Sequence, residues 1–257
     1  MENLDLRITA ALLNDVFKPK TSISVEYLDW QYHENPAGSA CIGYLLEANE
    51  QISNYALIPK IFENPLGNKL TLGVGVDLAV SPNSRGKGLF RKTIEKSYEA
   101  GIIGNLDGIL GVANSQSSPR MTEAMGWRKL PSLDFRLLKL SRSKIKLETF
   151  RLEDNELKKF PLEEFIDFKT FTHPSGFSPI WNAELLKWRL SRPEANYYLH
   201  TSESALLVTT KVSIGGIKVA VLLKTFPINP NEVPFPIAPF ASGIAKYHKT
   251  PFVAYWG

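Results

Sequence analysis

Cysteine and histidine are scarce in this sequence of 257 residues. Cys41 is the single cysteine, and the four histidines, His33, His173, His200 and His248, are scattered along the chain. One cysteine excludes a disulfide within the chain and any site built from several cysteine ligands. The histidines also lack the short spacings that are typical of a zinc site. We therefore expect no metal site and a reducing, cytoplasmic environment.

Long apolar runs and a strong charge are absent as well. No stretch approaches the roughly 18 apolar residues of a membrane-spanning helix, and the first residues, "MENLDLRITAALLNDVF", do not resemble a secretory signal. The net charge is only +4, and the basic residues form no block, which argues against nucleic acid as a partner. The hydrophobic share of 44% and the charged share of 22% are those of a globular domain. We expect neither a membrane nor a nucleic acid partner.

Hydrophobic spacing predicts an α/β order over the first 140 residues. We expect four helices, at 4–17, 25–34, 88–100 and 117–125, and the third of them should end at Gly101. We expect strands in a hairpin over 40–62 and at 70–80, 107–114 and 134–140. This order predicts a mixed sheet with flanking helices.

The chain changes character after residue 140, where it becomes rich in charge. We therefore expect one domain over 1–140 and a second over 141–257. In the second, "LLKWRLSRP" echoes "YLDWQYHENP" of the first, and Trp188 lies 158 residues after Trp30. Each is followed by a stretch that resembles an apolar hairpin, so we interpret the echo as a weak internal duplication. The alternative is two unrelated helices that share Leu-x-Trp.

The stretch "SPNSRGKG" between strand 70–80 and the next helix suits a phosphate. Pro82 stops the strand because it cannot donate to the ladder, and Gly86 and Gly88 let the backbone approach an anion closely. Arg85 and Lys87 add positive charge where a helix N-terminus offers unpaired N–H groups. The alternative is an ordinary strand-to-helix turn. Neither of the two common nucleotide-loop patterns is present, and no second "RGKG" follows Trp188.

Three segments resemble one known superfamily. "VDLAVSPNSRGKGLFRKTIEKSYEAG" is similar to the acetyl-coenzyme A motif of the GCN5-related N-acetyltransferases, Arg/Gln-x-x-Gly-x-Gly/Ala: Arg85 and Gly88 match, and Phe90 stands where Gly or Ala is usual. "ILGVANSQSSPRMTEAMGW" resembles the strand and helix that follow in the superfamily. "LDWQYHENPAG" resembles a segment of members found in bacterial surface-polysaccharide gene sets.

The resemblance implies a fold, an activity and a set of binding residues. The fold would be a mixed, mainly antiparallel, splayed sheet flanked by helices, followed by a second domain of the same or an α+β type that lacks the phosphate motif. The activity would be transfer of an acetyl group from acetyl-coenzyme A (acetyl-CoA) to a primary amine of a small molecule, with an amino sugar as one candidate. The residues implied in binding the cofactor are Leu78, Val80, Arg85, Gly86, Lys87, Gly88, Leu89, Phe90 and Asn114.

The resemblance also points to candidate catalytic residues. Asp77 and Glu47 are the carboxylates placed to act as a general base, and a solvated strand edge is the alternative for each. The superfamily's usual tyrosine acid is replaced by Thr122. For Asn114, a helix-capping role is the alternative.

Other functions stay open on the sequence alone. One is a module of the same fold that binds coenzyme A (CoA) without catalysis, which the absent acid favours. Another is an aminoacyl or longer-acyl transferase built from two copies of the fold, which the duplication favours. The oligomeric state is also open, a homodimer included.

Overall fold

The computed structural model describes residues 4–114, 117–140, 145–152, 157, 159–165, 176–228 and 235–256. The chain divides into two compact units. Unit 1 consists of Met1–Lys129 and Thr172–Trp188, and unit 2 of Leu130–Phe171 and Arg189–Gly257. This division differs from the expected boundary after residue 140, because each unit takes up a strand from the other part of the sequence.

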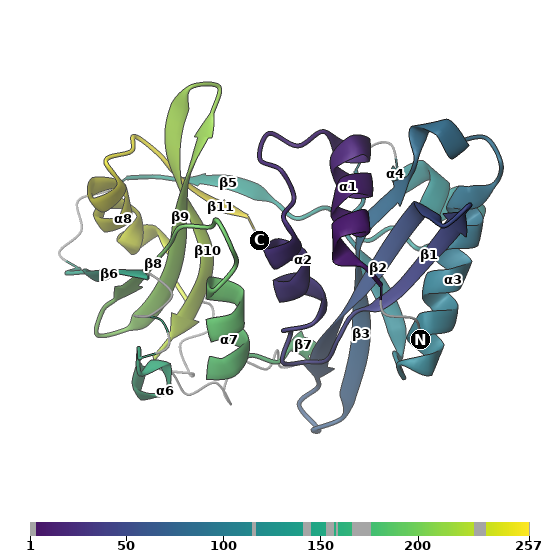
Figure 1. Ribbon diagram of the computed structural model, residues 1–257. Helices are drawn as coiled ribbons and strands as arrows, with labels where there is room; N and C mark the ends of the chain where they lie inside the picture. Colours follow the sequence, from purple (N-terminus) through teal and green to yellow (C-terminus); the bar gives the residue numbers. More distant parts are fainter. Residues whose placement is uncertain are drawn as a thin grey trace. The chain divides into compact units, whose positions relative to one another are not determined.

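Unit 1 contains a five-stranded sheet and its helices (Figure 1). Its elements are α1 (Leu6–Phe17), α2 (Val25–Tyr32), β1 (Cys41–Glu47), β2 (Glu50–Glu63), β3 (Lys69–Val80), η1 (Pro82–Ser84), α3 (Leu89–Ile103), β4 (Gly108–Gly111), α4 (Ser117–Pro119), η2 (Arg120–Ala124), β7 (Ser178–Pro179) and α7 (Ala183–Leu190), whose last residues belong to unit 2. The sheet order is β1-β2-β3-β4, with β7 paired to β2. The β1–β2 and β2–β3 pairs are antiparallel, and β3–β4 is parallel with α3 as the crossover.

The two faces of this sheet are covered by different helices. Along β2 successive side chains alternate between the faces. Ala56 and Ile58 pack with residues of α1 and α2, whereas Tyr55 and Leu57 pack with Ile94 of α3. The sheet of unit 1 is therefore the middle layer between α1 and α2 on one face and α3 on the other.

Helix α3 is longer than the sequence pattern predicted. The expected end at Gly101 is wrong, since the helix continues to Ile103 and is capped by Gly104. Gly101 is buried, and a Cβ added to it would lie 3.3 Å from side-chain carbons of both Leu57 and Leu106. The glycine at position 101 therefore allows α3 to pack closely on the sheet and does not end the helix.

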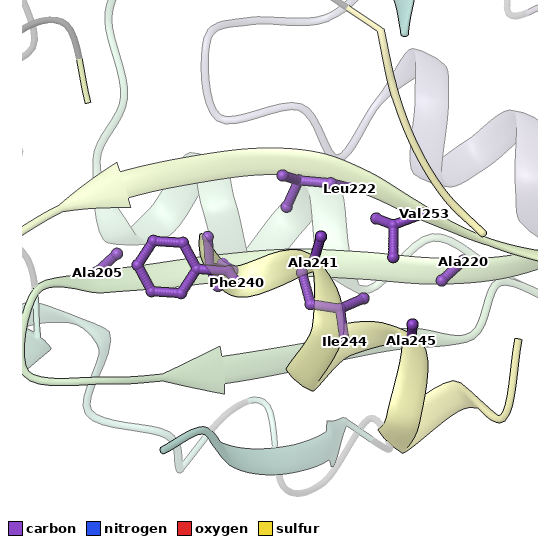
Figure 2. Packing of buried hydrophobic residues seen from close by; sticks show 9 residues of the cluster. Ala205, Ala220, Leu222, Phe240, Ala241, Ile244, Ala245 and Val253 are labelled. Carbon is purple, nitrogen blue, oxygen red and sulfur yellow. The ribbon is translucent and has the colours of Figure 1, made fainter. Parts of the chain in front are cut away.

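Unit 2 contains a six-stranded sheet. Its elements are β5 (Phe135–Leu138), β6 (Glu148–Leu152), α6 (Leu162–Phe165), β8 (Tyr197–Thr201), β9 (Ala205–Ile214), β10 (Ile217–Pro227), η4 (Ala238–Phe240), α8 (Ala241–His248) and β11 (Val253–Trp256). The strand order is β5-β11-β10-β9-β8-β6. Figure 2 shows the apolar core, in which Ala241, Ile244 and Ala245 of α8 pack against strand residues such as Leu222 and Val253.

The same order of elements occurs in both units. In each, an antiparallel three-strand meander is followed by a helix and then by a strand parallel to the third: β1-β2-β3, α3, β4 and β8-β9-β10, α8, β11.

The residues that carry the sequence echo also meet inside unit 1. The indole N–H of Trp30 donates to the carbonyl of Trp188 at 2.7 Å, that of Trp188 donates to the carbonyl of Trp30 at 2.9 Å, and the rings stack. Duplication itself stays a prediction.

A chain of buried polar groups crosses unit 2. The two ring nitrogens of His200 lie 2.7 Å from the hydroxyls of Thr149 and Thr209, and Thr209 lies 2.8 Å from Nε2 of His248. Both imidazoles are buried. Burial lowers the pKa of His200 to about 3 and that of His248 to about 4, assisted by His248 in the first case and Lys211 in the second. Both histidines are thus neutral at pH 7.

Two kinds of feature are missing from the part of the chain that the structure describes. It has no helix with the length and apolar character needed to cross a membrane. It also has no cluster of three or more His, Cys, Asp or Glu side chains that could hold a metal ion.

Candidate functional site

Strand β3 separates from β4 halfway along its length. The parallel pairing runs from Leu72 with Gly108 to Gly75 with Gly111, and β3 then continues to Val80. We call the unpaired side of 76–80 the open edge.

The direction of the main-chain groups on the open edge follows from the pairing with β2. The Ser81 N–H donates to the Ile52 carbonyl at 2.8 Å. Because antiparallel pairs alternate between bonded and non-bonded, the N–H and C=O groups of Val80 point away from β2. Leu78 lies inside the register shift between Ala79 and Val76, where this alternation is interrupted. Val80 can therefore accept and donate hydrogen bonds along the open edge.

The loop after β3 leads directly into α3. Gly86 and Gly88 have φ angles of 84° and 71°, and a Cβ on either would meet no heavy atom within 4 Å. Gly88 caps α3 without a side-chain hydrogen bond. Within the described residues, the N–H groups of 86–90 have no backbone acceptor. With the exposed Arg85 and Lys87 beside them, these N–H groups have the arrangement that an anion would need.

Leu89 and Phe90 form the first turn of α3. The Phe90 ring is partly buried against the cluster that contains Tyr55, Ile94 and Met121, and the Arg120 guanidinium lies 5.7 Å from the ring centre. The side chain is thus used for packing between α3 and the sheet, while the backbone N–H stays on the first helical turn. A phenylalanine at this position is compatible with an anion at the loop.

Glu47 lies at the loop and not at the middle of the sheet. Its carboxylate is 3.3 Å from Nζ of Lys87 and accepts from the Ser84 hydroxyl at 3.4 Å. The side chain is about half exposed. No local sequence signal indicated this contact, because 40 residues separate Glu47 from Lys87. The two candidate bases, Glu47 and Asp77, are therefore not brought together.

Asp77 lies at an irregularity of β3, where the register with β2 shifts. Its φ is 55°, a left-handed conformation that Asp and Asn adopt more readily than most residues. The carboxylate accepts hydrogen bonds from the Tyr32 hydroxyl at 2.9 Å and from the Gln31 amide at 3.3 Å. Burial raises the pKa of Asp77, while the hydrogen bond from Tyr32 lowers it in part. A carboxyl with a raised pKa is suited to accept a proton near neutral pH.

A polar network buried between the sheet and its helices holds Tyr32 in place. The Thr9 hydroxyl donates to Gln51 at 2.8 Å, Gln51 donates to Asn54 at 3.2 Å, and Asn54 donates to the Tyr32 hydroxyl at 3.2 Å and to the Asp77 carbonyl at 3.1 Å. The Tyr32 ring is fully buried, and its hydroxyl also orients Asp77, which no local sequence signal showed.

Asn114 and Thr122 are engaged in local hydrogen bonds. The Asn114 side chain accepts from the Ser117 N–H at 2.9 Å and so caps the short helix that follows. The Thr122 hydroxyl of η2 donates to carbonyls of the preceding α4, to Ser118 at 3.1 Å and to Pro119 at 3.2 Å. That the usual acid is absent at this position stays a prediction. Cofactor binding by Asn114 stays a prediction.

No family model matches the chain, and no curated protein matches it in sequence. Solved structures do match. A conserved protein of Enterococcus faecalis, described as a probable N-acyltransferase, has a TM-score of 0.67 and 11% identity over 98% of this chain and 62% of its own. A GCN5-related N-acetyltransferase of Anabaena variabilis has a TM-score of 0.66 and 13% identity over 98% of this chain and 63% of its own. The chain has the GCN5-related N-acetyltransferase fold.

A third solved structure that matches is an enzyme named for the myristoyl group. The N-myristoyltransferase of Saccharomyces cerevisiae, solved with myristoyl-CoA bound, has a TM-score of 0.55 and 12% identity over 98% of this chain and 70% of its own. The chain spans less than two thirds of the length of the Enterococcus and Anabaena proteins. At these identities the likeness establishes the GCN5-related N-acetyltransferase fold, and the reaction has to be argued from the residues.

Proposed function

We propose that the protein transfers an acyl group, in the first instance acetyl, from acyl-CoA to a primary amine of a small molecule. The observation that carries the proposal is a juxtaposition on β3. One strand bears an open edge, a partly buried carboxyl with a raised pKa at Asp77, and an anion-binding loop at its C-terminal end. The likeness to acyltransferase folds supports the same reaction.

The residues present fit coenzyme A. The free N–H groups of 86–90 and the side chains of Arg85 and Lys87 would hold the pyrophosphate, and the space around Gly86 and Gly88 is open. The main chain of Leu78 and Val80 would hydrogen-bond the amides of the pantetheine arm, as an added strand would. When bound, the thioester supplies an activated acyl carbonyl beside β3.

Asp77 would then act as the general base. Its ionised carboxylate takes a proton from the acceptor ammonium, which leaves a neutral amine able to attack the thioester carbonyl. Tyr32 and Gln31 orient the carboxylate through the hydrogen bonds already described. A backbone N–H of β3 beside the thioester can stabilise negative charge on the carbonyl oxygen. Because the Thr122 hydroxyl is engaged with α4, we assign protonation of the leaving thiolate to water.

The acceptor is proposed as a small amine, with an amino sugar as the first candidate, on the strength of the "LDWQYHENPAG" resemblance alone. A CoA-binding module without catalysis is the second candidate function, and the engaged hydroxyl of Thr122 is the observation that favours it. A screen of amines for thiol release from acetyl-CoA distinguishes the two. Release that depends on an amine identifies the enzyme.

Gly86→Glu should abolish CoA binding. The substitution adds a negative charge to the anion-binding loop and a Cβ to a residue with φ of 84°, so we expect binding at least about 100-fold weaker. Isothermal titration with CoA measures the change. Gly67→Glu is the matched control, because Gly67 also has a positive φ and open space but lies in the β2–β3 turn. Equal affinity in wild type and Gly86→Glu would contradict the proposed site.

Glu47→Gln should strengthen CoA binding. It removes the carboxylate that now pairs with Lys87, and so releases that ammonium for the phosphates. The pair is exposed, so we expect only about a two- to fivefold lower Kd at low salt and a smaller effect at high salt. The same titration at two ionic strengths checks it. Weaker CoA binding by this variant would show that Glu47 stabilises the loop and does not compete with the phosphates for Lys87.

A further inference from the structure

Two glycines at the point where β3 and β4 separate are each covered by an aromatic side chain. Gly75 and Gly111 form the last pair of the parallel ladder. The nearest atom to a Cβ placed on Gly75 would be the Tyr55 hydroxyl, and the nearest to one on Gly111 would be Cζ3 of Trp127, at 2.9 Å. The absence of side chains at both glycines is what allows the two rings to lie against the strands. We call Tyr55 and Trp127 the aromatic wall.

The aromatic wall is fixed in position by its neighbours. The indole N–H of Trp127 donates to the Tyr98 hydroxyl at 2.6 Å, and its backbone N–H donates to the Met121 carbonyl at 3.1 Å. Tyr55 is 3% exposed and packs with Ile94 and Met121. Moving either ring would break a hydrogen bond or open the core between α3 and the sheet.

The wall lies where the acyl end of a bound thioester would arrive. The anion-binding loop follows the C-terminal end of β3, whereas the wall lies at Gly75, the opposite end of the open edge. An arm that is anchored by its phosphates at the loop and runs along Leu78 therefore directs its acyl group toward Gly75 and Gly111. There the strands are joined by paired backbone, and the rings of Tyr55 and Trp127 lie against the two glycines of the last pair.

We propose that the aromatic wall restricts the enzyme to short acyl groups, with Trp127 as the residue that sets the limit. The inference rests on the proposed function and deepens it by naming the acyl class as acetyl and its nearest homologues. A longer chain meets the rings of Tyr55 and Trp127 and has to displace one of them. Each extra methylene that finds no space loses the transfer energy it would otherwise gain, about fourfold in affinity.

The test compares CoA, acetyl-CoA, butyryl-CoA and hexanoyl-CoA by isothermal titration to wild type and Trp127→Ala. We expect wild type to bind acetyl-CoA at least about tenfold more tightly than hexanoyl-CoA, and Trp127→Ala to remove or reverse that ratio while its Kd for CoA stays unchanged. Trp181→Ala is the matched control, since this partly buried tryptophan of unit 1 lies beside Lys60, away from Gly111. It should keep the wild-type ratio.

The outcomes separate the inference from the function on which it rests. If wild type binds CoA but holds acetyl- and hexanoyl-CoA equally, or if Trp127→Ala keeps the wild-type ratio, the wall does not select the acyl group and only this inference fails. If wild type does not bind CoA at all, the proposed function fails with it. Trp127→Phe covers the case in which the alanine variant does not fold. Its smaller ring should admit butyryl-CoA, and an unchanged preference would again overturn the inference.

Discussion

Asp77→Asn is expected to lower kcat for acyl transfer by about 100- to 1,000-fold, the usual contribution of a general base. Asparagine keeps the shape of the side chain, tolerates the φ of 55° and can still accept a hydrogen bond from Tyr32. What it loses is the ability to take a proton. The KM for acetyl-CoA should change little, because the cofactor is held by the loop and the main chain of β3.

The pH profile separates a base from a structural carboxyl. Burial raises the pKa of Asp77, and only the ionised form can accept a proton. Wild-type kcat should therefore fall on the acid side of the profile at a pH above the ordinary carboxyl range, and this limb should be absent in Asp77→Asn. The thermal midpoint of the variant should be equal or higher, since a partly desolvated charge has been removed.

Tyr32→Phe provides the matched comparison for Asp77. It keeps the buried ring but removes the hydroxyl that lowers the carboxyl pKa, so the acid limb of kcat should move to higher pH with a smaller loss of activity at its plateau. If Asp77→Asn keeps the kcat of the wild type, another group must be the general base. An unshifted acid limb in Tyr32→Phe would show that the hydroxyl does not act through Asp77.

Acid should destabilise unit 2 over a range set by its two buried histidines. In the unfolded chain both imidazoles titrate near 6.5, and in the fold the pKa is about 3 for His200 and about 4 for His248. The unfolded state thus binds more protons below pH 6.5. The stability that comes from the neutral imidazoles is complete above that pH and is lost progressively as the pH falls toward 4 and then 3, at up to about 1.4 kcal/mol per pH unit for each histidine.

Urea unfolding between pH 7.5 and 4.5 measures this loss. His200→Gln keeps hydrogen-bonding groups for Thr149 and Thr209 but cannot be protonated, so its stability should depend less steeply on pH, even where its absolute value is lower. His33→Gln is the control, because His33 is exposed, directly follows α2 and pairs with Asp29. A wild-type stability that stays flat from pH 6.5 to 4.5 would refute the assignment.

Much of unit 1 could be predicted from the sequence because its signals are local. The apolar run of β3, Pro82 after it and the glycines before α3 fix a strand, a loop and a helix within some thirty residues. The open edge was expected by resemblance. The partners of the site residues were not, because Tyr32 lies 45 residues from Asp77 and Glu47 lies 40 from Lys87. Such contacts depend on how helices pack on the sheet, which spacing along one element does not show.

The domain boundary shows the same limit. The strand at 134–140 was expected, and β5 is present at Phe135–Leu138, but it pairs with β11 of unit 2 and not with the sheet of unit 1. The apolar residues of β5 would suit a strand in either sheet, so they do not indicate which sheet it joins. Likewise Ser178 and Pro179 pair with Glu63 and Phe62 of β2. The sequence of that short segment does not predict which strand it pairs with.

The exchange of segments between the two halves of the sequence affects how the chain can fold during synthesis. Unit 1 needs Trp188 to complete its reciprocal hydrogen bonds with Trp30, and unit 2 needs β5, which is made before most of its sheet. A ribosome that has released residues 1–140 has therefore released neither unit in full. The hydrogen bonds between Trp30 and Trp188 can form only after the second tryptophan, 158 residues later in the chain, has been made.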